Sequence, residues 1–179
     1  MDPRSNVKPH YTPQRIAWLA LLTAFSSVGR LVFTVPFLPN IQPMTAMLML
    51  VTLHLGGVDG IIVSTLSILL TNMLLGMGPW TLHQVLTYAI LMVLVGASRK
   101  LYQKHTSRSL ILMALFAGSI GLLYGLIISL FSVWTYQIPS FWAYYLRGLP
   151  FDALHAVGNI GFFVLLNPLL APILHKRFR

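Results

Sequence analysis

The sequence predicts an all-α integral membrane protein with six transmembrane helices and both termini in the cytoplasm. Of its 179 residues, 56% are hydrophobic and 8% are charged, whereas a soluble domain has about 45–50% apolar and about 25% charged residues. Because so few charged residues cannot cover the surface of a soluble domain, the composition excludes an ordinary soluble protein. It also excludes an intrinsically disordered chain, because disordered chains are poor in apolar residues. The length allows roughly six spans of about 20 residues each. The absence of cysteine excludes disulfides, a thiol nucleophile and cysteine metal sites.

Positive charge is concentrated in three segments, which sets the predicted orientation. Ten of the 12 basic residues lie in these segments: Arg4, Lys8 and Arg15; Arg99, Lys100, Lys104 and Arg108; Lys176, Arg177 and Arg179. Basic flanks of membrane spans stay on the cytoplasmic side. Membrane topology therefore explains the net charge of +9, and we do not expect the chain to bind nucleic acid.

The first half of the predicted membrane domain contains three apolar segments. Residues 1–15 are polar and contain three prolines, which indicates a cytoplasmic tail without a secretory signal peptide. The first span, Ile16–Val35, ends at a proline and is followed by a proline-punctuated loop. Met44–Leu55 is short, and a glycine-rich turn separates it from Ile61–Leu75. Whether these two segments cross the membrane fully or form a hairpin that returns to the outside stays open.

The second half contains the three remaining spans. A tight loop at 76–81 leads to Leu82–Ala97, and the basic segment then separates this span from Leu110–Trp134. Residues 135–149 are predicted to form an outer loop, and Phe151–Leu174 is the last span. Residues 16–175 thus form one membrane domain, with a basic cytoplasmic end at 176–179.

Polar side chains in the predicted spans gather at one depth, near the outer surface. An ionisable or amide side chain in hydrocarbon is costly and usually faces protein or a cavity. These residues come from four spans: Arg30; Asn72; His83, Gln84 and Tyr88; Asp152, His155 and Asn159. A proton relay or a pore would need polar groups through the whole membrane. The pattern therefore predicts a pocket that opens outward.

Each of these residues also has a structural explanation. Arg30 and Asp152 could neutralise each other, and Asn72 could bridge helices. The histidines could be hydrogen-bonded packing residues. The aromatic residues of the outer segments could form the rim of the pocket or an interfacial belt: Trp80, Trp134, Tyr136, Phe141, Trp142, Tyr144 and Tyr145.

The chain is not expected to be an enzyme. Its acidic residues are Asp2, Asp59 and Asp152, which leaves no pair of carboxylates at one depth. A metal site of His83, His155 and Asp152 in an intramembrane hydrolase is the enzymatic alternative. No G-x-x-x-x-G-K-[ST] motif occurs, so the chain cannot cradle nucleotide phosphates by itself.

Small residues on the first span predict a docking face. Ala20 and Ala24 form an A-x-x-x-A pattern, and Ala17 lies one turn earlier. Small residues at this spacing let two helices approach closely in lipid.

This pattern, together with four further motifs, resembles the substrate-binding S-components of energy-coupling factor (ECF) vitamin transporters. The motifs are V-G-R (28–30), P-N-I-Q-P-M-T (39–45), L-G-G-V-D-G (55–60) and N-x-x-x-G-x-G-P-W-T (72–81), and the resemblance covers nearly the whole chain. It implies a multi-pass protein of the bacterial plasma membrane that binds a vitamin from outside. It also implies that Ala17, Ala20 and Ala24 dock on an ECF coupling transmembrane subunit, which works with two ATPase subunits.

The loop pattern is most similar to the cobalamin branch of that family, so cobalamin is the expected ligand. A pocket for cobalamin would combine amide and cationic hydrogen-bonding groups with broad aromatic surfaces. The predicted substrate-binding residues are Arg30, Asn40, Gln42, Asn72, Trp80, His83, Gln84, Tyr88, Trp142, Tyr145 and Asp152. The same set would suit another vitamin or a queuosine-like base, and a stand-alone carrier or channel is the rival class.

We expect the chain itself to bind no metal or cofactor. We also expect that neither His83 nor His155 coordinates the cobalt of the ligand. ATP and Mg would be used by the partner ATPases.

Overall fold

The computed structural model describes residues 11–34, 39–104 and 108–178, and within these ranges all regular structure is helical. The helices are α1 (Pro13–Val32), α2 (Met44–Leu55), α3 (Gly57–Leu75), α4 (Pro79–Ala97), α5 (Arg99–Lys104), α6 (Arg108–Tyr136) and α7 (Phe141–Phe178). In the described part of the chain, five helices are long and apolar enough to cross a membrane, and α2 is shorter. The predicted all-α membrane fold is confirmed.

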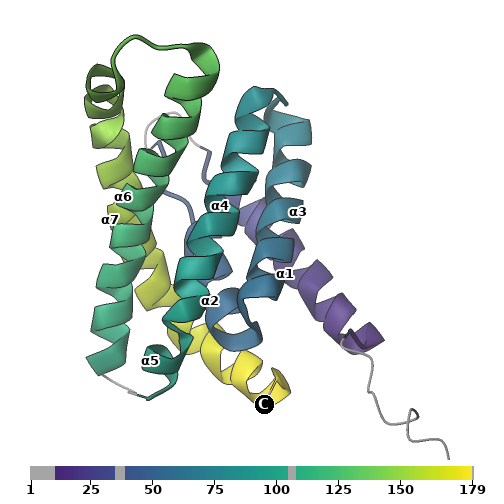
Figure 1. The fold of residues 1–179 in the computed structure, drawn as a ribbon. Helices are drawn as coiled ribbons and strands as arrows, with labels where there is room; N and C mark the ends of the chain where they lie inside the picture. The colour runs from purple at the N-terminus through teal and green to yellow at the C-terminus, as the bar shows by residue number, and fades with distance from the viewer. Residues whose placement is uncertain (1–10, 35–38, 105–107, 179) are drawn as a thin grey trace, which may run out of the picture.

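The helices form a bundle with two distinct ends (Figure 1). The start of α1, the turn between α2 and α3, the short helix α5 and the C-terminus lie at one end, which we call the inner end. The α3–α4 and α6–α7 turns lie at the opposite, outer end. Arg15, Arg99 and Lys176 therefore lie toward the inner end, which the distribution of charge predicts to be cytoplasmic. Arg4, Lys8 and Arg179 lie outside the described residues.

Helix α2 is the buried centre of the bundle. Eleven of its 12 residues are buried, as expected for a helix that is apolar on every side. At 1.5 Å per residue α2 is about 18 Å long, roughly 10 Å shorter than α3, which turns back from its inner end at Gly56. Its first residue, Met44, therefore stops well short of the outer end. The turn between the second and third predicted spans lies at the inner end, and α2 is shorter than the five helices that are long enough to cross a membrane.

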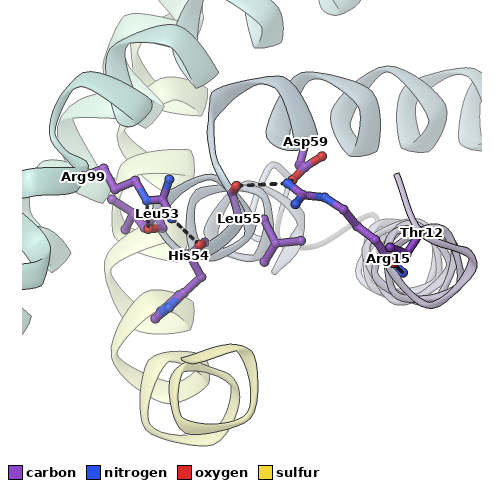
Figure 2. Close-up of polar contacts among 7 residues, drawn as sticks. All are labelled: Thr12, Arg15, Leu53, His54, Leu55, Asp59 and Arg99. Atoms are coloured by element: carbon purple, nitrogen blue, oxygen red, sulfur yellow. Dashed lines mark hydrogen bonds and ion pairs between the residues drawn. The ribbon is translucent and has the colours of Figure 1, made fainter. Parts of the chain in front are cut away.

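Two arginines hold the inner end of α2 (Figure 2). Arg99 donates from Nε to the carbonyl oxygen of Leu53 at 3.0 Å and from Nη2 to that of His54 at 2.6 Å. Arg15 of α1 donates to the carbonyl oxygen of Leu55 at 3.4 Å and forms an ion pair with the buried Asp59. The last carbonyls of a helix lack intrahelical partners, and cations are favourable near this negative end of the helix dipole. The two side chains therefore fix α2 to α1 and to α5.

Helices α6 and α7 approach closely along a row of glycines. A Cβ atom at Gly121 would lie 2.8 Å from the backbone nitrogen of Ala156, and one at Gly125 would overlap the carboxyl group of Asp152. Small residues allow such an approach between membrane helices. The seam places Asp152 directly against the backbone of α6.

The outer segment 135–149 differs from the prediction. It was expected to be a loop, but α7 begins at Phe141 and continues through Pro150. Proline removes one backbone donor, and membrane helices tolerate this because neighbouring groups satisfy the freed carbonyl. Phe141, Trp142, Tyr144 and Tyr145 therefore stand on the first turns of α7, and Tyr136 is the last residue of α6. The predicted end of the first span, at Val35 and Pro36, lies outside the described residues.

Candidate ligand-binding site

A cavity of about 390 Å³ lies at the outer end of the bundle. It is bounded by the end of α1, the segment that leads into α2 and the end of α3: Arg30, Phe33, Thr34, Pro39, Asn40, Gln42 and Leu75. Its volume is within the range of about 300–1,000 Å³ that small-molecule pockets have. The cavity occupies the region that the short helix α2 does not reach. We call it the outer cavity.

A second cavity of about 60 Å³ lies next to the first, toward the middle of the bundle. Arg30, Asn40 and Gln42 line both cavities, so they form the boundary between them. The remaining walls of this deep cavity come from α3, α4, α6 and α7: Ile68, Gln84, Tyr88, Tyr124 and His155. Five of the predicted substrate-binding residues thus line these two adjacent cavities: Arg30, Asn40, Gln42, Gln84 and Tyr88. Their binding role stays a prediction.

The segment before α2 turns sharply to bring its amides into both cavities. Asn40 has a φ of 64°, in the left-handed region that asparagine enters more readily than most residues. Its Nδ2 lies 3.4 Å from the carbonyl oxygen of Phe151, on α7. This contact holds the segment against the outer part of α7.

Arg30 is held by a neutral partner. Its Nη1 donates to Oγ1 of Thr71 on α3 at 2.5 Å. In the described ranges the sole ion pair is the one between Arg15 and Asp59, so Arg30 is not neutralised by Asp152. The carboxyl group of Asp152 instead packs against Gly125, and its Oδ2 accepts no hydrogen bond from the described residues.

The wall of the deep cavity is organised by Thr45, a residue that the sequence reasoning did not select. Its hydroxyl lies 2.9 Å from the hydroxyl of Tyr88 and 3.0 Å from Nε2 of His155. The ring of Tyr124 packs against both neighbours, with centroids 5.1 Å from Tyr88 and 5.1 Å from His155. One residue in the first turn of α2 thus joins α4 and α7, and the aromatic ring of α6 closes the cluster.

Asn72 and His83 support the site without lining either cavity. Asn72 donates from Nδ2 to Oε1 of Gln84 at 2.7 Å and to Oγ1 of Thr81 at 2.9 Å, which orients Gln84. His83 forms a hydrogen bond of 2.8 Å to Thr135 and stacks on Phe131, both on α6. These contacts agree with the alternatives in which Asn72 bridges helices and His83 is a hydrogen-bonded packing residue.

Trp80, Trp142, Tyr145 and Asp152 also lie outside the two cavities. Trp80 and Trp142 are 45% and 66% exposed, and Tyr145 stacks on Phe141 with a centroid distance of 5.7 Å. In a membrane, such side chains at the outer end would lie at the interface, where tryptophan and tyrosine are enriched. A role of these residues in ligand binding stays a prediction.

The small residues of α1 face away from the bundle. Ala17, Ala20 and Ala24 are exposed, whereas Leu19, Leu22 and Thr23 on the opposite face of the same helix are buried. The helical period explains this division, since residues three and four apart share a face. The alanine face is thus free to receive another helix.

No three acidic or histidine side chains come together as a metal site in the part of the chain that the structure describes. His83 is hydrogen-bonded to Thr135, and His155 is hydrogen-bonded to Thr45. The geometry therefore gives no support to the alternative of a hydrolase built on His83, His155 and Asp152.

The chain is thus a helical membrane protein with a cavity at its outer end. Residues 14–167 match the family described as ECF transporter, substrate-specific component. The chain therefore belongs to this family, whose members bind the transported substrate and associate with a coupling membrane subunit and ATPases. The comparisons with curated proteins and with solved structures give no significant match.

Proposed function

We propose that the chain captures a vitamin-sized molecule from outside the bacterial plasma membrane and delivers it through an ECF coupling subunit driven by ATPases. The observation that carries the proposal is the pair of adjacent cavities toward the outer end, with amide, cationic and aromatic walls. The exposed alanine face of α1 supports docking on the coupling subunit, because small residues permit close helix packing in lipid.

The volume of the cavities favours a ligand smaller than cobalamin. Cobalamin has about 90 non-hydrogen atoms and exceeds the drug-sized ligands that pockets of about 300–1,000 Å³ enclose. The outer cavity, at about 390 Å³, is suited to a smaller aromatic vitamin or a modified base of the queuosine type. Cobalamin is the ligand that the loop resemblance favours, and its binding would require the segment 39–43 and the first turns of α7 to move apart.

Calorimetry of the purified chain with a panel of vitamins tests this proposal. We expect one small vitamin to bind at nanomolar concentration and with a stoichiometry of one. Gln42→Trp should weaken that binding at least about tenfold, because the indole would occupy both cavities. Leu115→Trp, at an exposed position of α6, is the matched control and should bind normally. Heat from cobalamin alone would reverse the choice of ligand, and no heat from any vitamin would refute the proposed function.

A further inference from the structure

The balance of charge around Arg30 is incomplete. The whole chain has three acidic residues. Asp59 is paired with Arg15 at the inner end, Asp152 packs against Gly125 without an ion pair to any described residue, and Asp2 lies outside the described residues. An arginine within a membrane span is costly unless it finds a counter-charge or water. The outer half of the described structure offers Arg30 no carboxylate partner.

Arg30 is part of the wall of the space where a ligand would lie. Arg30 lines both the outer and the deep cavity. A guanidinium has five N–H donors, and one hydrogen bond is formed with a described residue, from Nη1 to Thr71. The other donors are available to a group inside the cavities. Asn40 and Gln42, at the same boundary, can add amide donors but no charge.

Thr71 acts as a support for Arg30 and not as a counter-charge. Its hydroxyl lies 2.7 Å from the carbonyl oxygen of Ser67 and donates to it. The lone pairs of the same oxygen remain free to accept from Arg30. The arrangement holds a cation in a fixed position and leaves its charge unmatched, which is how a preorganised anion site is built.

We propose that Arg30 is the anion anchor of the binding site, and that the transported ligand carries a carboxylate or a phosphate ester which pairs with this side chain. The inference rests on the proposed function, because it names the chemical class of the ligand of the same cavities. Planar, bidentate recognition by arginine suits both kinds of anion. A ligand without an anionic group would leave the charge of the guanidinium unmatched.

Matched pairs of ligands test the inference on the wild-type chain. The carboxylate pairs are biotin with biotinamide, nicotinate with nicotinamide and pantothenate with panthenol. The phosphate pair is pyridoxal 5′-phosphate with pyridoxal. We expect the anionic member of one pair to bind at least about 30-fold more tightly than its neutral partner, the loss typical when one member of a buried charge pair is removed. The pair that responds identifies the anion.

Substitutions at Arg30 then attribute the preference to this side chain. Arg30→Gln should reduce the affinity for the anionic ligand to that of the neutral one, whereas Arg30→Lys should restore part of it. Thr71→Val keeps the charge of Arg30 and removes its hydrogen bond to Thr71. It should therefore weaken the binding of the anionic and the neutral ligand by more similar factors than Arg30→Gln does. Should Arg30→Gln fail to fold, Arg30→Lys is compared with the wild type instead, and a smaller preference of Arg30→Lys for the anionic ligand supports the inference.

The failure of this inference can be told apart from failure of the proposed function. Tight binding of a neutral vitamin, unchanged by Arg30→Lys or Arg30→Gln, would overturn the anion anchor while the proposed function stands. Equal affinity for the anionic and the neutral member of every pair that binds would also overturn the anion anchor. No binding by any member of the panel would refute the proposed function, and this inference with it.

Discussion

Replacing Ala24 with tryptophan is expected to abolish transport by the assembled complex while leaving ligand binding by the isolated chain intact. Ala24 is exposed on the face of α1 that also carries Ala17 and Ala20. A bulky indole there would separate α1 from the docked coupling helix and remove the close contacts that hold membrane helices together. Ala24 lines neither cavity, so the affinity for the ligand should stay within about twofold. Uptake into vesicles and calorimetry provide the two measurements.

Leu115→Trp is the matched control for this experiment, because it adds an indole at an exposed position of α6, away from the alanine face. It should transport normally. Normal transport by the Ala24→Trp complex would show that the alanine face is not the docking surface. Loss of ligand binding by the isolated Ala24→Trp chain would instead indicate damage to the fold.

Replacing Arg15 with glutamine is expected to destabilise the bundle by about 3–5 kcal/mol, the usual effect of removing one partner of a buried ion pair. The side chain of Asp59 is 1% exposed, so the carboxylate would lose its counter-charge with little access to water. The carbonyl of Leu55 would lose its donor as well. Figure 2 shows that this one guanidinium joins α1 to the turn between α2 and α3. Thermal unfolding in detergent, followed by tryptophan fluorescence, measures the effect.

A double-mutant cycle separates the ion pair from simple loss of packing. Asp59→Asn should destabilise less than Arg15→Gln, because the side chain of Arg15 is 25% exposed and can be solvated in part. The double variant Arg15→Gln with Asp59→Asn should recover a large part of the lost stability, since no buried charge then remains. Additive effects of the two substitutions would contradict the assignment.

The helical membrane fold could be predicted because it follows from composition and from the length of apolar segments. The bounds of α2 were predicted at Met44 and Leu55, where a proline and a glycine flank the apolar run. What periodicity could not show is that α2 starts deep in the bundle, because depth depends on how its neighbours extend past it. The extension of α7 to Phe141 was missed because Pro150 indicates a helix end in water, whereas a membrane helix can continue through it.

Part of the candidate site could be recognised from residue type. Arg30, Gln84 and Tyr88 are polar groups in apolar spans, which is a strong signal because their burial is costly. Thr45 and Tyr124 gave no such signal, since a hydroxyl is common in membrane helices, and their importance comes from the side chains they contact across the bundle. The aromatic side chains of Trp80 and Trp142 would suit either a ligand pocket or an interfacial belt. The sequence could not decide between these two roles, because the choice depends on where the side chains lie in the fold.

Uptake of the identified ligand into proteoliposomes tests the central claim most directly. The claim is that the chain binds the ligand and depends on partner subunits to move it. Vesicles that contain the chain, the coupling subunit and both ATPase subunits should accumulate the ligand when ATP is supplied, and vesicles with the chain alone should not. Accumulation or equilibration at the full rate by the chain alone, without ATP, would contradict the account and identify the protein as a stand-alone carrier.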